Sequence, residues 1–404
     1  MSTVPDASRP LAGLRILDLS TVVSGPMATG MLADQGAEVI KVESRGGDLT
    51  RVIGPAKGDL SGLYAALNRG KRSIVLDARQ PAGLHILREL IARADAVVEN
   101  FRPGVMERLG LPWERLHAEH PRLVMLSITG YGPDGPRAGE RVYDTVIQAV
   151  SGMADAHPDE RSGEPRLLRT LMCDKVTALT AAQALTAALL ARSRDGGGRR
   201  VQVNMLDAAV AFLWPEAGYN HAFLDEPPEP VPEYGSTLAL WRAADGWFAM
   251  VTPQDDEFAG MCRAFGHPEW IVDPRFTTIP LRRRHYAELR AMAEGFIAQQ
   301  PVAHWLERLA AEGAPAGRVN RKAELPHDAQ VMHNGTFAEV AHAGIGRIRM
   351  PRPAARFDGA HAQPVPAAPH LGEHTREVLR ACGRSDAEID ELIAQGVVQA
   401  GRSG

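Results

Sequence analysis

The first half of the chain alternates short apolar segments with longer segments of helical periodicity. The apolar segments of strand length are residues 14–18, 38–43, 73–77, 96–99, 123–127 and 200–204. The segments with helical spacing are residues 28–35, 81–94, 112–117, 143–153 and 205–212. Strands that alternate with helices in this way predict an α/β fold with a mostly parallel sheet and helices on both faces.

One of the predicted helices is unusual because it has no polar face. From Val176 to Ala191 the chain contains no charged residue, Gly or Pro, and Ala and Leu dominate. Such a segment has high helix propensity and is apolar or small on nearly every side, which predicts burial inside a large protein. It is too short and too rich in Thr and Gln to span a membrane.

Asp174 stands at the start of this helix and is the only acidic residue between Arg169 and Arg192. A carboxylate in the first turn commonly caps a helix, and the helix dipole favours its charge there. The same position suits a partly buried nucleophile whose charge is held by backbone N–H groups. The residue pattern alone leaves both roles open, and they are compatible.

The pattern changes after residue 225. Residues 226–235 are rich in Pro and resist regular structure. The apolar segments 238–242 and 247–251 then flank Ala-Ala-Asp-Gly, which predicts a hairpin. Helices are expected at residues 255–265, 282–299 and 302–312, a second hairpin at 337–341 and 346–350, an irregular segment at 351–369, and helices at 373–382 and 385–394.

These changes predict the domain organisation. We expect a large α/β domain in residues 1–220, a linker in 221–235 and a smaller α+β domain in 236–330. Residues 331–404 are expected to form a second linker and a C-terminal segment that returns to the large domain. A length of 404 residues fits two or three domains.

Composition and charge narrow the class of protein. The chain is 45% hydrophobic and 23% charged, which is ordinary for a globular protein. Its 45 Lys and Arg against 49 Asp and Glu give a net charge of −4, which offers no general electrostatic case for nucleic-acid binding. No targeting or transmembrane segment is apparent, and no His pair has metal-ligand spacing, so we expect a cytoplasmic protein without a metal site.

The three cysteines, Cys173, Cys262 and Cys382, are scattered along the chain. Their spacing fits neither a metal site nor a disulfide framework, which is typical of a reducing compartment. Cys173 adjoins Asp174 and is a possible nucleophile, but no His is close in sequence. Burial as a small apolar side chain is the favoured interpretation.

Several loops are candidates for ligand contact. Gly25-Pro26 follows the first strand, at the edge of the sheet where ligands usually bind, although G-x-G-x-x-G and Walker patterns are missing. The loop at residues 68–72 carries three cations that suit either phosphate binding or a solvated basic turn. The loop at 99–104 combines Phe101 with Arg102, which suits an adenine ring and a phosphate, or a plain turn.

Together, these segments resemble the family III CoA-transferases (the CaiB/BaiF family), which include formyl-CoA transferase and carnitine CoA-transferase. The resembling segments are residues 13–20, 24–26, 36–43, 68–73, 98–104, 130–132, 143–152 and 371–375. They cover most of the chain. No single segment is decisive, but by their number and order the chain is identified as a member of this family.

The resemblance assigns roles to individual residues. The catalytic aspartate of the family matches Asp174, which favours the nucleophile interpretation. The CoA-contacting positions of the family match Val23, Ser24, Asn68, Arg69, Gly70, Asn100, Phe101, Arg108, Arg141, Tyr143 and Asp144. Arg141 replaces what is often Lys, and either cation can meet a phosphate.

Two departures concern the substrate. The formyl-CoA enzymes have a glutamine at the position of Val23 and a glycine-rich loop in the small domain that is not found here. Both differences argue against formyl-CoA and oxalate as the substrate pair. In the family, small-domain loops such as residues 233–237 face the site and are expected to select the substrate.

The resemblance implies an activity and an assembly. CoA would move from a donor acyl-CoA to an acceptor carboxylic acid, through an aspartyl anhydride and an aspartyl-CoA thioester on Asp174. CoA and acyl-CoA would be substrates, with no permanently bound cofactor; succinyl-CoA is a common donor, and a dicarboxylate or hydroxy acid is a plausible acceptor. The family combines a Rossmann-like large domain with a small domain, and its subunits form an interlocked, ring-like homodimer.

Two alternatives remain at this stage. An α-methylacyl-CoA racemase shares the fold but needs two acid–base groups, an aspartate at the position of Asp174 and a histidine in a His-Asp pair. The matching pair here is Tyr143-Asp144, and Tyr is a poor base near neutral pH. The second alternative is a non-catalytic CoA-binding protein, against which the presence of Asp174 among the matching motifs argues.

Overall fold

The structure is a computed structural model that describes residues 9–159, 162–343, 345–361 and 366–401. The chain divides into two compact units, each described separately. The first unit contains the chain up to Phe212 together with the chain from Gln330 onward, and the second contains Leu213–Ala329. Among the described residues, no helix combines the length and apolar character that crossing a membrane requires.

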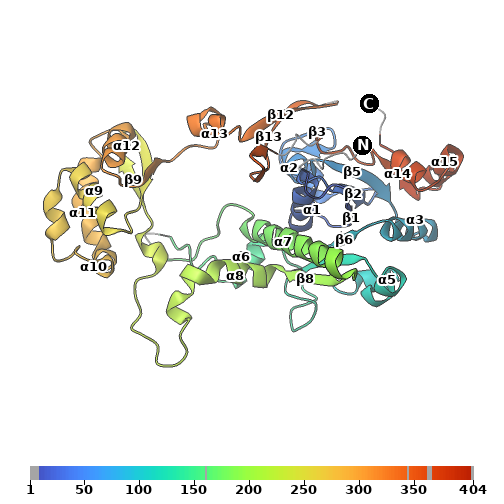
Figure 1. Cartoon of the computed structure of the whole chain (residues 1–404), viewed down its shortest axis with the longest axis horizontal. Helices are drawn as coiled ribbons and strands as arrows, with labels where there is room; N and C mark the ends of the chain where they lie inside the picture. Colours follow the sequence, from blue (N-terminus) through green and yellow to red (C-terminus); the bar gives the residue numbers. More distant parts are fainter. Residues whose placement is uncertain (1–8, 160–161, 344, 362–365, 402–404) are drawn as a thin grey trace. The chain divides into compact units, whose positions relative to one another are not determined.

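The first unit is built on a seven-stranded sheet (Figure 1). Its strands, in spatial order, are β16 (Val398–Gln399), β5 (Lys71–Leu76), β2 (Glu38–Glu43), β1 (Arg15–Asp18), β6 (Ala96–Glu99), β7 (Val124–Thr129) and β8 (Arg200–Asn204). All are parallel except β16, which pairs antiparallel with β5. The predicted mostly parallel α/β fold is therefore confirmed, and the carboxyl ends of six strands meet at one edge, which we call the carboxyl edge.

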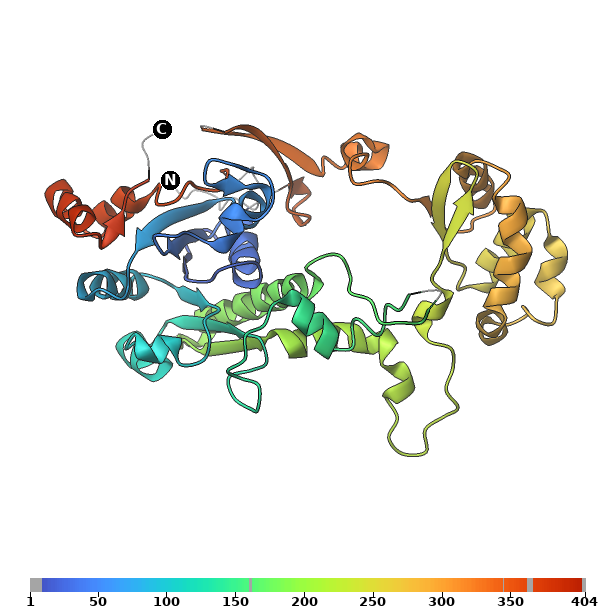
Figure 2. The same cartoon turned by 180° about the vertical axis from the view of Figure 1, so that it is seen from behind.

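Helices cover both faces of this sheet, as predicted (Figures 1 and 2). One face packs against α1 (Ser24–Asp34) and α7 (Met172–Asp195). The other face packs against α3 (Pro81–Ala92), α5 (Trp113–Glu119), α14 (Thr375–Ala381) and α15 (Asp386–Ala394). Each face thus has its own apolar core, and α1 and α7 share one of them.

The long helix α7 is buried on one side only. Ala178, Ala181 and Leu185 are fully buried against the sheet and α1. Leu179 and Leu190 are 54% and 58% exposed on the opposite side. The expectation of burial on nearly every face is therefore wrong for the single chain, because an uncharged side of α7 faces outward.

The remaining elements of the first unit are short. They are η1 (Leu49–Val52), β3 (Ala56–Lys57), β4 (Leu60–Ser61), α2 (Gly62–Asn68), α4 (Val105–Arg108), α6 (Asp144–Val150), α13 (Ala329–His333), β12 (Phe337–His342), β13 (Gly346–Pro351), β14 (Arg356–Phe357) and β15 (Ala360–His361). The second predicted hairpin is confirmed as β12 and β13. The sequence pattern missed α2 and the edge strand β16, and residues 362–365 of the expected irregular segment lie outside the described residues.

The second unit has a three-stranded antiparallel sheet packed on helices around an aromatic core. Its elements are β9 (Leu240–Ala243), β10 (Gly246–Met250), α9 (Asp255–Phe265), α10 (Ile279–Arg284), α11 (Tyr286–Ile297), α12 (Val302–Ala311) and β11 (Ala316–Arg318), with 3-10 turns at Tyr219–His221, Tyr234–Thr237, Pro268–Val272 and Leu325–His327; α8 (Met205–Ala217) precedes them. The predicted hairpin is confirmed as β9 and β10. The single helix expected at 282–299 is wrong, because His285 leaves the helical conformation and separates α10 from α11.

Candidate active site

Asp174 lies at the carboxyl edge, between the N-termini of two helices. It is the third residue of α7 and is only 8% exposed. Its carboxylate accepts a hydrogen bond from the backbone N–H of Ser24, the first residue of α1. The preceding N-cap residue of α1 is Val23, which has no side-chain acceptor. Asp174 therefore supplies, from another helix, an acceptor that the start of α1 lacks.

The environment of Asp174 raises the pKa of its carboxyl group to about 7. Burial is the main cause, the negative charge of Asp144 is the second, and the Ser24 N–H opposes both. Near neutral pH the carboxyl is therefore ionised in roughly half of the molecules. A shifted pKa on a carboxyl at the ligand-facing edge of an α/β sheet is typical of a catalytic group.

Asp144 is the residue that binds the N-terminus of α7. Its Oδ1 accepts the backbone N–H of Asp174 at 2.9 Å, and its Oδ2 accepts from Nε2 of Gln148 at 2.6 Å. Gln148 in turn accepts the N–H of Leu168 at 2.8 Å and donates to the carbonyl of Thr170 at 3.0 Å. Asp144 and Gln148 together thus fix the segment that leads into α7 and the helical turn that carries Asp174.

Cys173 has the environment of a core residue. Its side chain is fully buried, and its Sγ lies 3.9 Å from Sδ of Met153. Burial, followed by the charges of Asp144 and Asp174, raises the pKa of the thiol to about 12. The interpretation of Cys173 as a buried apolar side chain is confirmed, because a thiol that does not ionise is a poor nucleophile.

Several residues assigned by resemblance lie on the segments that surround Asp174. Val23 and Ser24 are buried at the start of α1, and Asp144 is buried at the start of α6. Tyr143, which precedes Asp144, is 60% exposed, and Arg141 is also exposed. This group is brought together by the bonds from Asp174 to Ser24 and Asp144.

Three further assigned residues follow β6 in the chain. Both polar atoms of the Asn100 side chain bond to the backbone of Thr21, and Phe101 packs partly against the core beneath α3. Arg108 is exposed at the end of α4. Asn100 thus has its hydrogen bonds within the protein, whereas Arg108 presents its guanidinium to solvent.

The basic loop at residues 68–72 joins α2 to β5. It precedes β5, so it lies at the amino ends of the parallel strands, opposite the carboxyl edge. Its three cations already have carboxylate partners: Arg69 pairs with Asp34, Lys71 with Asp18 at 2.8 Å, and Arg72 with Glu38 at 2.6 Å. Lys71 Nζ also donates to Oδ1 of Asn68 and to the carbonyl of Pro26 in the first turn of α1, each at 2.8 Å, so the loop is linked to the start of α1. The contact of Asn68, Arg69 and Gly70 with CoA stays a prediction.

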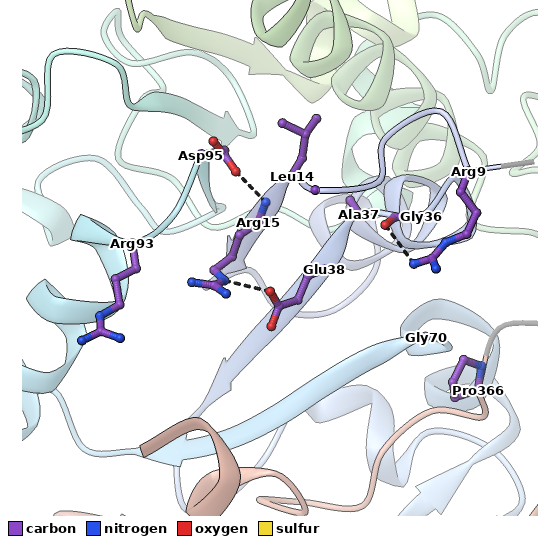
Figure 3. Close-up of a pocket in the computed structure, with 11 residues that line it drawn as sticks. Arg9, Leu14, Arg15, Gly36, Ala37, Glu38, Gly70, Arg93, Asp95 and Pro366 are labelled. Atoms are coloured by element: carbon purple, nitrogen blue, oxygen red, sulfur yellow. Dashed lines mark hydrogen bonds and ion pairs between the residues drawn. The ribbon is translucent and has the colours of Figure 1, made fainter. Parts of the chain in front are cut away.

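A pocket of about 620 Å³ opens at this amino end of the sheet (Figure 3). Arg15, Glu38 and Asp95 line it, and Arg15 bonds to Glu38 at 2.8 Å and, through its backbone N–H, to Asp95 at 2.7 Å. Gly70 is the predicted site residue that also lines it. Because Asp174 lies at the other edge of the sheet, this pocket is separate from the candidate active site.

The sequence analysis missed Gln148 and the buried pair of Lys41 and Asp48, whose Nζ and Oδ2 are 3.0 Å apart. Gln148 carried a weak signal, because it follows Asp144 by four residues on an otherwise apolar helix and such pairs face one another. Asp48 carried none, because its target is the backbone of Val22, far from it in sequence.

Comparisons with known proteins show which family the chain resembles. Residues 11–375 match the sequence profile of CoA-transferase family III. The chain is 35% identical over 399 residues to the succinyl-CoA:glutarate CoA-transferase of Mus musculus, covering 98% of this chain and 91% of the relative. It is 35% identical over 374 residues to the acetyl-CoA:oxalate CoA-transferase of Acetobacter aceti, covering 90% and 93%. A crystal structure of a CAIB/BAIF family protein from Brucella suis superposes with a TM-score of 0.79 at 32% identity, covering 92% and 99%.

The raised pKa predicts how stability depends on Asp174. Between its usual value of 3.8 and about 7, the unfolded chain has this carboxyl ionised while the folded chain keeps it protonated. Folding stability therefore falls as pH rises through this window, by up to about 1.4 kcal/mol per unit, and Asp174→Asn removes the loss. We expect the variant to be more stable at pH 8 by about 4 kcal/mol at most, with a smaller gain at pH 5.

Urea denaturation of both proteins between pH 5 and pH 8 measures this difference. Asp195→Asn is the matched control, since Asp195 ends the same helix and is exposed, so its effect should not grow with pH. A stability difference for Asp174→Asn that is independent of pH would contradict the buried, pKa-shifted environment.

Proposed function

The chain belongs to CoA-transferase family III, and from this premise we propose that Asp174 is the nucleophile that carries the acyl group and then CoA. The observation that carries the proposal is a buried carboxyl with a pKa of about 7 at the N-terminus of α1. Such a group is ionisable at neutral pH and is more basic than an ordinary carboxylate.

The first half of the reaction moves CoA onto the enzyme. A carboxylate oxygen of Asp174 attacks the thioester carbonyl carbon of the donor, the C–S bond breaks, and CoA leaves as a thiolate from a mixed anhydride. The thiolate then attacks the aspartyl carbonyl carbon. The bond to the anhydride oxygen breaks, the donor acid leaves as a carboxylate, and an aspartyl-CoA thioester remains.

The second half repeats these steps in reverse order. The acceptor carboxylate attacks the aspartyl thioester carbonyl and expels CoA thiolate, giving a second mixed anhydride. The thiolate attacks the acceptor carbonyl of that anhydride, which forms the acceptor-CoA thioester and restores the Asp174 carboxylate. No proton is consumed overall, so the site needs no separate general acid.

The surroundings of Asp174 supply what a weak nucleophile lacks. The Ser24 N–H binds the Asp174 carboxylate and favours its ionised, nucleophilic form. The positive end of the α1 dipole stabilises the anions that form at each carbonyl. Binding energy from the distant nucleotide of CoA can hold the thioester in place, so that positioning contributes to the rate.

Exposed cations near the carboxyl edge suit the phosphates of CoA. Arg108 and Arg141 are both exposed, and neither forms an ion pair within the described part of the chain. Phe101 and Tyr143 offer aromatic surface on the same segments. Together these features support the proposed CoA contacts of Arg108, Arg141, Phe101 and Tyr143.

We propose succinyl-CoA as the donor and a dicarboxylate as the acceptor. Support comes from relatives named for succinyl-CoA and glutarate, and for acetyl-CoA and oxalate. The racemase alternative is less well supported. It needs a second acid–base group, and the acid next to Asp174 in the described part of the chain is Asp144, whose two oxygens are bound to the Asp174 N–H and to Gln148.

A homodimer would cover the outward side of α7. Between Lys175 and Arg194, the exposed residues on this side recur at helical spacing and carry no charge. They are Leu179, Gln183, Ala187 and Leu190. An uncharged stripe on an exposed helix is typical of an interface, and we propose that a second copy of this chain packs there, as in the interlocked dimers of the family.

The covalent intermediate is the first test of this function. We expect that incubation with succinyl-CoA gives a CoA adduct that is sensitive to hydroxylamine and maps to Asp174, because the aspartyl-CoA thioester is stable until an acceptor arrives. Intact mass followed by peptide mapping measures it. Asp174→Ala should lose the adduct and reduce transfer to glutarate at least about 10⁴-fold, since the nucleophile is removed.

Asp195→Ala is the control for this variant, because it removes an exposed carboxylate from the other end of α7. It should keep both the adduct and turnover. Transfer that persists in Asp174→Ala would reject Asp174 as the nucleophile. Exchange of the α-proton of a 2-methylacyl-CoA, without transfer, would support the racemase instead.

The dimer is tested by placing a charge in the stripe on α7. Leu190→Arg should shift the protein from dimer to monomer in light scattering after size-exclusion chromatography, because a buried unpaired guanidinium opposes association. Ala394→Arg, on the exposed surface of α15, is the matched control and should remain dimeric. A monomeric parent protein would contradict the proposed assembly.

A further inference from the structure

The turn between β1 and α1 contains a strained residue. Val22 has a φ of +69°, in the left-handed region that a β-branched residue rarely enters. Among the described residues, only Glu226 and Asp358 share a positive φ without being Gly. Such strain persists only where neighbouring groups hold it, and it concentrates at functional sites.

Asn100 holds the backbone just before Val22. Its Oδ1 accepts the N–H of Thr21 at 2.8 Å, and its Nδ2 donates to the carbonyl of Thr21 at 2.7 Å. The side chain therefore replaces both hydrogen bonds that a strand neighbour would make. Because both polar ends of the amide are used, Asn100 has limited capacity left to bind CoA.

Asp48 holds Val22 itself. The Val22 N–H points at the Asp48 carboxylate, with its oxygens 3.2 and 3.3 Å from the nitrogen. Lys41, which is fully buried, pairs with Asp48 at 3.0 Å and donates to the carbonyl of Ser20 at 2.9 Å. Burial alone would raise the pKa of Asp48, but the charge of Lys41 and the hydrogen bonds from Lys41 and Thr50 together lower it and keep the carboxylate ionised. The turn is thus bound from the ends of β2 and β6.

The turn leads directly to the site. Only Val23 separates Val22 from Ser24, whose N–H bonds to the Asp174 carboxylate. A change of φ at Val22 would therefore redirect the first turn of α1 and move that N–H away from Asp174. The bonds to Asn100 and Asp48 set the direction in which α1 begins.

We propose that Asn100 and Asp48 are positioning residues that keep Val22 in its left-handed conformation and thereby hold the Ser24 N–H on the Asp174 carboxylate. This inference rests on the proposed role of Asp174. It gives Asn100 an indirect role, through Thr21 and Val22, in place of the CoA contact that the resemblance implies.

Asn100→Ala distinguishes a positioning role from a CoA contact, because the two roles change different kinetic parameters. Losing a hydrogen bond to the ionised form raises the pKa of Asp174, so the rise of kcat/KM with pH should move above about 7. At pH 7, kcat should fall about tenfold or more, because the nucleophile is misplaced and less ionised, while KM for succinyl-CoA changes less than about twofold. A CoA contact would instead raise KM and leave the pH profile in place.

A second substitution isolates the strain. Val22→Gly adopts a positive φ without steric cost, so the turn then depends less on its anchors. In the Val22→Gly background, Asn100→Ala should lower kcat less than about threefold, whereas in the parent protein it lowers kcat about tenfold. A double-mutant cycle measures this coupling between the two positions. A residue that contacts substrate would lose the same factor in both backgrounds.

Two further variants complete the design. Asn100→Asp keeps an acceptor for the Thr21 N–H but loses the donor, so its pH profile should lie between those of the parent and Asn100→Ala, and it serves if the alanine variant fails to fold. Asn220→Ala removes an equivalent clamp, on Val231 in the second unit, and should leave the pH profile unchanged.

The outcomes separate this inference from the function on which it rests. A parent protein that forms no CoA adduct rejects the proposed function. The positioning role is overturned by an active parent in which Asn100→Ala raises KM, keeps its pH profile and lowers kcat by the same factor with and without Val22→Gly.

Discussion

The N-termini of α1 and α7 are joined by carboxylates, and the candidate site depends on this arrangement. The first N–H groups of a helix have no partner within it. The N–H of Asp174 is bound by Asp144, and the Asp174 carboxylate binds the N–H of Ser24. Two acids are thereby placed side by side at a buried edge, where the charge of Asp144 opposes the ionisation of Asp174. The helix N-termini offset part of that cost, and the remainder appears as the raised pKa of Asp174.

This arrangement requires that α1 and the turn before it approach their neighbours closely. A Cβ on Gly25 would lie 2.2 Å from Oγ of Ser20, and one on Gly30 would lie 2.7 Å from the carbonyl of Leu67. Alanines on the facing side of α7 pack in one core with the residues of α1. Small residues therefore set the distance between the two helices, and the side chains bound to the turn set the direction of α1. The reactive carboxylate lies where both conditions are met.

The sequence predicted those features that depend on neighbours along the chain. Apolar runs of strand length predicted the parallel sheet, and the position of Asp174 in a first helical turn predicted a carboxylate bound by backbone N–H groups. Features that depend on partners far away in the sequence were not predicted. The cations of the loop at 68–72 looked available, but Arg69 and Arg72 pair with Asp34 and Glu38, which lie more than thirty positions away. The outward side of α7 was predicted to be buried. An uncharged helix has the same sequence pattern whether it packs against its own chain or against another subunit.

Lys41 shows why the supporting residues of the site were the hardest to predict. It occupies a strand in which an apolar residue precedes and follows it, a pattern typical of a side chain directed to solvent, yet it is fully buried. Burying an ion pair seldom adds stability relative to apolar residues of similar size. The pair of Lys41 and Asp48 instead orients the turn before α1. Lys41 binds the carbonyl of Ser20, and Asp48 binds the N–H of Val22. A pair that orients a turn has no local sequence signal, because its function is defined by the backbone that it binds.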